Sequence, residues 1–277
     1  MEVRYSPDQN GFKKMDTTEL RNSFLIESLF TPNKIPMVYS DVDRSITGSA
    51  VPVGKTLQLV ATKKEMAAEH FCDRREVGVI NIGKSGVVTI DGTDYKMDYR
   101  DALYIGRGAK SVEFKSDNAE TPAHFYFVSY PAHTAYPTKH ITYDQAIHRH
   151  LGATETSNKR TINQYILPDI LPTCQIVMGL TELEDGSVWN TMPCHTHQRR
   201  SEVYMYFNLN PDAFVVHLMG EANETRHIII RDRQAVLSTS WSLHSGCGTQ
   251  SYSFIWAMGG ENQVFDDMDA IGTEKLK

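Results

Sequence analysis

The segment from Trp189 to Tyr206 carries the densest group of side chains that could do chemistry. It contains His195 and His197, with Glu202 five positions later. On an extended chain, residues i and i+2 project to the same side, so the two imidazoles would point together toward Glu202. A third imidazole, His244, follows after two further predicted strand pairs, which suffice to bring the chain back beside its start. Imidazole and carboxylate are borderline-to-hard ligands, so we predict a site for a divalent metal such as Zn, Fe, Ni or Mn.

The same spacing of two histidines and a glutamate occurs a second time, at His148, His150 and Glu155. This copy runs into a polar, turn-rich stretch with no strand after it. Glu202, in contrast, opens a run of residues that is typical of a β-strand. We therefore interpret the copy at His148 as a chance match and expect no metal there.

Most of the chain has the pattern of short strands separated by turns. β-branched and aromatic runs recur roughly every 10 to 12 residues between Gly, Pro, Asn and Asp, as in a sandwich or barrel. One short helix is predicted after Asp16, because Asp16 and Glu19 have the spacing of a capping box. The predicted strands cover residues 77–82, 87–90, 95–97, 102–105, 112–114, 124–128, 174–183, 203–207, 214–219, 227–230, 235–237 and 252–258. The sequence therefore predicts an all-β protein with few short helices.

The two halves of the chain contain similar sequence motifs in a similar order. Arg74, Arg75 and Glu76 precede one predicted strand, as Arg199, Arg200, Ser201 and Glu202 precede another. Residues 136–158 are polar and turn-rich, so we interpret them as a linker between the halves. We predict an N-terminal β half over residues 1–150 and a metal-binding barrel over residues 151–277. The first half keeps only Glu76 of a ligand set, which predicts one metal per chain.

Composition excludes several classes of protein. The chain has 277 residues, of which 40% are hydrophobic, so an ordinary globular core is expected rather than disorder. With a net charge of -6, the chain lacks the excess of basic residues that nucleic-acid binding requires. No run approaches the ~18 apolar residues of a membrane helix, and the first residues lack a signal-peptide pattern, so no membrane partner and a cytoplasmic location are expected. The four cysteines are far apart and predict neither disulfides nor a thiolate metal site.

The metal motif is followed by two predicted hairpins and then by a His before Gly. This order resembles that of the cupin superfamily, whose small β-barrels hold one metal at their open end. The chain as a whole resembles the 4-deoxy-L-threo-5-hexosulose-uronate ketol-isomerase family of bacterial pectin breakdown. The likeness extends over nearly the whole chain, in residues 37–40, 74–83, 101–106, 132–139, 156–163, 189–202, 224–228 and 261–269. The resemblance implies cupin-type double-stranded β-helix barrels in a bicupin-like duplication.

The family resemblance implies that the protein is a zinc-dependent aldose–ketose isomerase that acts on a small sugar acid. Members of this family are typically homohexamers. Its metal ligands map onto His195, His197, Glu202 and His244. The family's substrate, 5-dehydro-4-deoxy-D-glucuronate, carries an aldehyde beside a hydroxyl-bearing carbon. The product, 3-deoxy-D-glycero-2,5-hexodiulosonate, has the carbonyl on that neighbouring carbon, so the net chemistry is the relocation of a proton.

The residues that bind the substrate and move the proton are less well defined by the sequence. The substrate carboxylate needs a cation, and the candidates are Arg199, Arg200, Lys159 and Arg160. Glu202 is one candidate for the proton-transferring base, and a Tyr or a Lys is the other. Two other functions fit the same ligand set: a non-haem iron dioxygenase of the cupin type, and a non-catalytic cupin that binds sugar acids.

Overall fold

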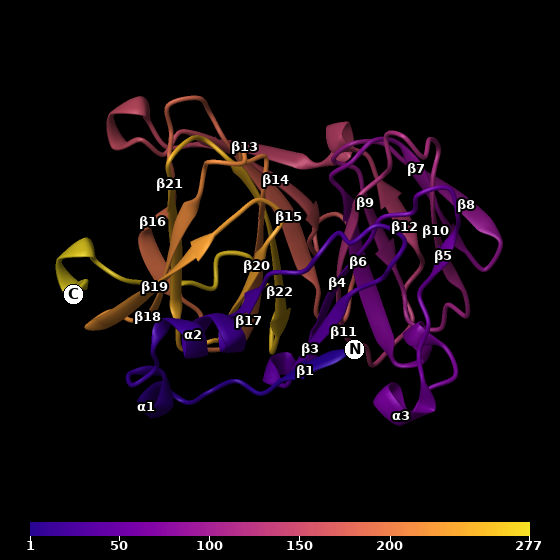
Figure 1. Ribbon diagram of the computed structural model, residues 1–277, viewed down its shortest axis with the longest axis horizontal. Coiled ribbons are helices and arrows are strands. Elements are labelled where there is room, and N and C mark those ends of the chain that lie inside the picture. Colours follow the sequence, from indigo (N-terminus) through magenta and orange to yellow (C-terminus); the bar gives the residue numbers. More distant parts are fainter.

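The computed structural model describes all residues from 1 to 277 and consists of two β-barrels side by side (Figure 1). Each barrel is built from one seven-stranded sheet and one smaller sheet. The prediction of an all-β protein with few short helices is confirmed. No helix is long and apolar enough to cross a membrane.

The first barrel, purple to magenta in Figure 1, contains most strands of the first half of the chain. In sheet order, its large sheet consists of β1 (Glu2–Arg4), β3 (Met37–Ser40), β4 (Ile46–Ala50), β11 (Phe125–Pro131), β6 (Arg75–Asn81), β9 (Ala102–Ile105) and β12 (Lys139–Ile141). Its small sheet consists of β5 (Leu57–Gln58), β10 (Val112–Ser116), β7 (Gly86–Ile90) and β8 (Thr93–Met97).

The second barrel, mostly pink through orange to yellow, contains the strands that carry the predicted metal ligands. Its large sheet consists of β13 (Ile147–Leu151), β14 (Arg160–Ile166), β15 (Val177–Leu183), β22 (Ser253–Gly260), β17 (Arg200–Phe207), β20 (Ala235–Ser238) and β2 (Leu25–Ile26). Its second sheet consists of β19 (Glu224–Ile230), β18 (Val215–Glu221), β21 (Leu243–Gly248), β16 (Trp189–Thr196) and β23 (Asp269–Ala270).

Side-chain alternation along the strands divides the core into three parts. In β17, Tyr204 and Tyr206 face the interior of the second barrel, while Val203 and Met205 face the first barrel. In β6, Val77 and Val79 face the interior of the first barrel and Ile80 faces the second. The large sheets of both barrels therefore share one apolar cluster of 27 buried residues, which holds the barrels together.

Strand β1 belongs to the first barrel, but the segment that follows it, from α1 to β2, packs on the second barrel. Helix α1 (Gln9–Phe12) contacts β18, and helix α2 (Thr17–Phe24) contacts β19 and β20. Strand β2 then pairs with β20. The predicted helix after Asp16 is confirmed as α2, with both bonds of the capping box to Glu19 present. The third helix, α3 (Lys63–Met66), lies beside the first barrel (Figure 1).

The prediction of a linker over residues 136–158 is wrong in part, because this stretch contains β12 and β13. All five residues of β13 are exposed, although the strand pairs along its whole length with β14. An edge strand with two solvent-facing sides needs no apolar alternation, so its sequence gives no strand signal.

Candidate metal centre

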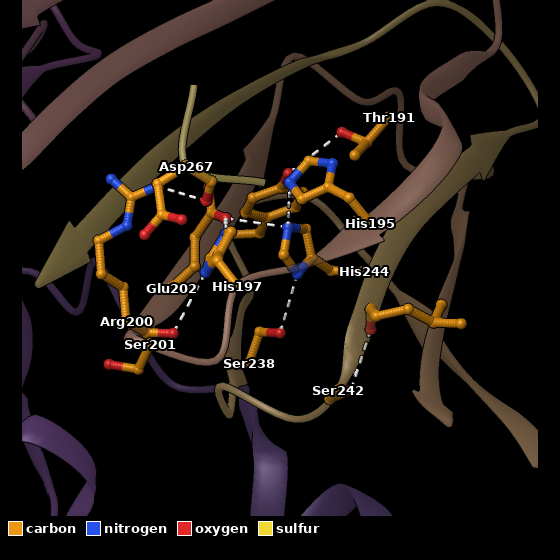
Figure 2. A network of polar contacts seen from close by, with 12 residues as sticks. Thr191, His195, His197, Arg200, Ser201, Glu202, Ser238, Ser242, His244 and Asp267 are labelled. Carbon is orange, nitrogen blue, oxygen red and sulfur yellow. Dashed lines mark hydrogen bonds and ion pairs between the residues drawn. The ribbon is translucent and has the colours of Figure 1, made fainter. Parts of the chain in front are cut away.

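The four predicted ligands are positioned by three strands of the second barrel. His195 lies near the end of β16 and pairs in register with His244 on the neighbouring strand β21. His197 directly follows β16, and Glu202 lies in β17 of the opposite sheet. Figure 2 shows the three imidazoles and the carboxylate pointing toward one another. The chain thus brings the four side chains together from two separated stretches of sequence.

The distances between the four groups are short. The Glu202 Oε2 atom lies 3.0 Å from the Nε2 atoms of both His197 and His244. The Nε2 atoms of His244 and His195 are 3.2 Å apart. One ligand atom from each residue fits within a mutual distance of 4.8 Å. Ligands at about 2.0–2.1 Å from a tetrahedral zinc ion lie about 3.3 Å from one another, so the cluster has the size of a metal site.

Hydrogen bonds behind the ligands orient two of the rings. The Nδ1 atom of His197 lies 3.2 Å from the carbonyl oxygen of Arg200, and that of His244 lies 3.2 Å from the Ser238 hydroxyl (Figure 2). Contacts of this kind at Nδ1 leave Nε2 free to bind a metal, as they do in metalloproteins generally.

The Glu202 carboxylate gives the cluster a negative charge that a cation could balance. Burial would raise the pKa of the Glu202 carboxyl, but the imidazoles of His244 and His197 hold it well below its ordinary value. Burial lowers the pKa of His195 to about 3. Burial also works against the charged form of His197, yet its bond to Glu202 raises its pKa. A charged carboxylate beside three imidazoles could hold a divalent metal ion, and this donor set fits Zn, Fe, Ni or Mn.

A pocket of about 250 Å³ leads to the cluster. Much of its wall is apolar, formed by Pro193, Phe254, Trp256, Met258, Phe265 and Met268. The polar groups outside the cluster are two arginines, Arg149 and Arg160, with Thr181, Thr191, Tyr204 and Asp266. The Tyr204 hydroxyl lies 3.1 Å from the Thr191 hydroxyl. A pocket that combines apolar walls with placed polar groups is the ordinary form of a small-molecule site.

Of the four predicted substrate-binding cations, the structure brings only Arg160 into this pocket. Lys159 pairs with Glu184 at 2.9 Å on the surface. Arg199 pairs with Asp267 at 2.7 Å and with Asp269 at 2.9 Å.

Arg200 has a different place from the other three, because it is almost fully buried below the cluster. It donates to the Asp267 carbonyl oxygen. Together with Arg199 it fixes residues 262–270, called here the C-terminal strap, beside the metal cluster (Figure 2). Neither Arg199 nor Arg200 lines the pocket.

Two parts of the site were missed by sequence reasoning. Arg149 lies on β13, between the two exposed histidines of the second motif copy, in the stretch that we interpreted as a linker. The strap, to which the sequence assigned no role, carries Asp267 and Asp269, which complement the adjacent arginine pair. The match of charges between residues 199–200 and 266–269 could have indicated the strap, whereas the exposed strand β13 has no local pattern that would indicate Arg149.

The histidines of the second copy of the motif have local partners instead of one another. The Nδ1 atom of His148 contacts the Asn163 amide oxygen, and that of His150 contacts the Thr161 hydroxyl. Both pairs lie across the β13–β14 ladder and satisfy the rings locally. Only the cluster at His195 has the composition and closeness of a metal site.

Glu76, the one residue of the first half that matches a ligand in sequence, has a structural role. Its carboxylate accepts hydrogen bonds from the backbone N–H groups of residues 174–176 and from the Tyr104 hydroxyl. Strand alternation places Glu76 on the outer face of its barrel, toward the second barrel, whereas Glu202 faces its own barrel's interior. Glu76 therefore joins the two halves and lies at no metal cluster.

The fold and the site define a two-barrel cupin with one candidate metal centre in the second barrel. The KduI/IolB family matches residues 27–271, and the chain belongs to that family. It is 53% identical, over 100% of both chains, to the 4-deoxy-L-threo-5-hexosulose-uronate ketol-isomerase of Escherichia coli O8 (strain IAI1), and equally similar to that of Escherichia coli O45:K1.

Solved structures with little sequence identity share the fold. An IolB-like protein from Salmonella typhimurium LT2 is similar with a TM-score of 0.72 and 13% identity, covering 90% of this chain and 96% of that one. AerE from Microcystis aeruginosa is similar with a TM-score of 0.55 and 11% identity, covering 86% of this chain and 99% of that one. At these identities the likeness shows the architecture alone.

Proposed function

We propose that this protein is a metal-dependent aldose–ketose isomerase that converts 5-dehydro-4-deoxy-D-glucuronate to 3-deoxy-D-glycero-2,5-hexodiulosonate. The observation that carries the proposal is the meeting of three imidazoles and one carboxylate at the end of a pocket that also holds two arginines. The full-length similarity to ketol-isomerases supports the same reaction. Zinc, one ion per chain, is the proposed metal; Fe, Ni and Mn suit the same ligands.

The residues of the cluster would hold the ion through the Nε2 atoms of His195, His197 and His244 and through Oε2 of Glu202. A bound divalent ion supplies Lewis acidity for the oxygens of the aldehyde and its neighbouring hydroxyl, worth several kcal/mol. The protein's own part is to hold the ligands on strands, where their geometry is set before the substrate arrives.

Arg160 is the proposed partner of the substrate carboxylate, with Arg149 as a second cation. Burial lowers the pKa of Arg160, and the ionisable groups that act on it are the hydroxyls of Tyr204 and Tyr252, so no carboxylate neutralises it. Its Nη1 donates to the Asn158 carbonyl oxygen at 2.8 Å, which orients the guanidinium. The Nη1 atom of Arg149 is only loosely paired with Asp266, at 3.9 Å, and is free to turn toward a ligand.

The proton-transferring group is Glu202 or Tyr204, since no lysine lines the pocket. The lowered pKa of Glu202 favours a charged ligand that is a weak base. Burial raises the pKa of Tyr204 well above its ordinary value, so its hydroxyl is a proton donor at neutral pH. We propose that Glu202 remains a metal ligand and that Tyr204 relays a proton between the two substrate oxygens. Its hydroxyl gives a proton to the aldehyde oxygen and then takes one from the neighbouring hydroxyl, while the hydrogen on that carbon moves with its electron pair to the aldehyde carbon.

The division into units over residues 1–150 and 151–277 is part of the proposal, with the segment from α1 to β2 packed on the second unit. A cytoplasmic homohexamer remains a prediction from the family resemblance.

The decisive experiment combines a turnover assay, using unsaturated uronates derived from pectin, with elemental analysis of the purified protein. We expect about one metal ion per chain, loss of turnover on chelation, and recovery with zinc or a similar ion. A His195→Ala/His197→Ala variant should bind no metal and lose at least about 100-fold in turnover. The matched control is His148→Ala/His150→Ala, which has the same spacing on an exposed strand and should retain both metal and activity. Full activity in the metal-free variant, or substrate-dependent oxygen uptake in place of isomerisation, would refute the proposal.

A further inference from the structure

The first barrel buries an arginine, Arg75, at the start of strand β6. Alternation with Val77 and Val79 directs its side chain into the first barrel. In the second barrel, the ladder register places Arg200 at the position that matches Arg75, whereas Glu202 matches Val77.

Arg75 is buried without a counter-ion. Only 8% of its surface is exposed, and burial lowers the pKa of its guanidinium to about 10. The ionisable groups that act on it are Tyr39, Cys72 and Tyr130, none of which is a carboxylate. Burying an unpaired charge is costly in free energy, and an anion that binds beside it would recover part of that cost.

The hydrogen bonds of Arg75 hold the guanidinium but do not exhaust its donors. Nε donates to the Ser129 hydroxyl at 3.0 Å, and Nη2 donates to the carbonyl oxygens of Arg44 and Ser129 at 2.5 and 2.8 Å. Nη1 has no partner among these bonds. The side chain is thus fixed from one side and has donors left for a ligand.

A cavity of about 270 Å³ adjoins this side chain. Arg74 and Arg75 both line it, and its one carboxylate, Glu65, is paired with the Met1 amino group at 2.8 Å. The remaining wall is largely apolar: Ile46, Met66, Ala68, Phe71 and Pro131, with the ring of Tyr39. A positive cavity with apolar walls suits an organic anion better than a strongly hydrated inorganic one.

We propose that the first barrel has its own binding site, separate from the metal centre, in which Arg75 receives the carboxylate of a small organic acid whose apolar part packs against Phe71 and Met66. The proposal does not depend on the reaction assigned to the second barrel.

Calorimetric titration of the metal-loaded protein with butanoate, benzoate and inorganic phosphate tests the site. An Arg160→Gln background removes the carboxylate site proposed in the second barrel, so that the remaining binding reports on the first. We expect benzoate and butanoate to bind this variant, and to bind about tenfold or more weakly once Arg75→Gln is added. In otherwise unchanged protein, Arg75→Gln should leave isomerase turnover unaltered.

A second variant keeps the test independent of folding, because Arg75→Gln also loses the bonds to Ser129 and Arg44. Ala68→Leu narrows the cavity and leaves Arg75 and its partners intact. It should weaken benzoate binding more than butanoate binding, with an unchanged melting temperature. Binding that neither substitution alters, no binding of either carboxylate, or tighter binding of phosphate than of both carboxylates would each overturn the proposal.

Discussion

The imidazoles of His195 and His244 meet edge to face with their Nε2 atoms 3.2 Å apart, although 49 positions separate them in the sequence. They are direct partners across the β16–β21 ladder. Because the pair is set by strand register, neither ring depends on a mobile loop for its position. The prediction that His244 returns to the side of His195 and His197 thus agrees with the geometry, and the metal affinity of the site should depend on how firmly these rings are held.

The Ser238 hydroxyl, which contacts Nδ1 of His244, gives the first test of that dependence. Ser238→Ala should lower zinc affinity by about tenfold, since a contact at Nδ1 orients the ring and increases its basicity as a ligand. Competition with a coloured chelator measures the change. His244→Ala should abolish tight binding altogether. Ser242→Ala, close by on the same turn but bonded to backbone groups, serves as the control and should keep the affinity of the unaltered protein. Equal affinity for Ser238→Ala and the unaltered protein would contradict the role given to this contact.

The sequence predicts the inward-facing parts of this molecule better than its surface. His195, His197 and Glu202 lie in or beside strands whose alternation is visible, so their convergence follows from the two-residue period. Arg149 was missed because β13 is exposed on both sides and shows no such period. Glu76 was matched with Glu202 by its neighbours in sequence, yet it lies on the opposite face of its strand, and a shift of one residue reverses every side chain. The partners of Arg199 and Arg200 come from residues 267–269, and a contact over that distance leaves no local pattern.

Arg160 and Arg149 should act on substrate binding rather than on metal content. If Arg160 receives the substrate carboxylate, Arg160→Gln should raise KM by about 10- to 150-fold, the loss expected for a charge-assisted hydrogen bond. Arg149→Gln should have a smaller effect in the same direction, because the Arg149 side chain is more exposed. Steady-state kinetics with metal analysis separates binding from loss of the ion. Lys159→Gln is the matched control, since Lys159 pairs with Glu184 outside the pocket. A large rise in KM for Lys159→Gln with none for Arg160→Gln would reverse the assignment.

The Arg199 pairs with Asp267 and Asp269 should govern the order of the C-terminal strap rather than global stability. Arg199 is partly exposed, and exposed ion pairs contribute little to stability, so Arg199→Gln should barely change the free energy of unfolding. Exchange of backbone amide hydrogens in residues 266–271 should accelerate, because β23 is held by only two register pairs with β16. Mass spectrometry of peptides from the strap measures this. Unchanged exchange there would show that Phe265 and the backbone contacts suffice to hold it.

Acid stability should depend in part on Asp101. Burial would raise the pKa of its carboxyl, but bonds from His140 and from the backbone N–H groups of Asp98 and Tyr143 bring it below the ordinary value of 3.8. A carboxyl whose pKa is lowered by folding stabilises the folded state at pH values above the pKa that it has in the unfolded chain. This stabilisation is lost as the pH falls from there through the lower pKa of the folded state. The free energy of unfolding should therefore decrease below about pH 3.8, and less steeply in Asp101→Asn. Urea unfolding at several pH values measures the two slopes, and equal slopes would exclude Asp101 as a contributor.

Glu76 should hold the two barrels together through its charge. Its buried carboxylate accepts three backbone N–H groups from residues 174–176 and the Tyr104 hydroxyl, all at 2.7 to 2.9 Å. Glu76→Gln keeps the size of the side chain but replaces one acceptor oxygen with a donor that would face a backbone N–H group. We expect a loss of about 3 kcal/mol in the free energy of unfolding, as when one partner of a buried charged network is removed. Metal content should stay at that of the unaltered protein, because Glu76 is not part of the ligand cluster. Chemical denaturation together with elemental analysis separates the two effects, and a Glu76→Gln protein that is fully stable but has lost its metal would place Glu76 at a metal site after all.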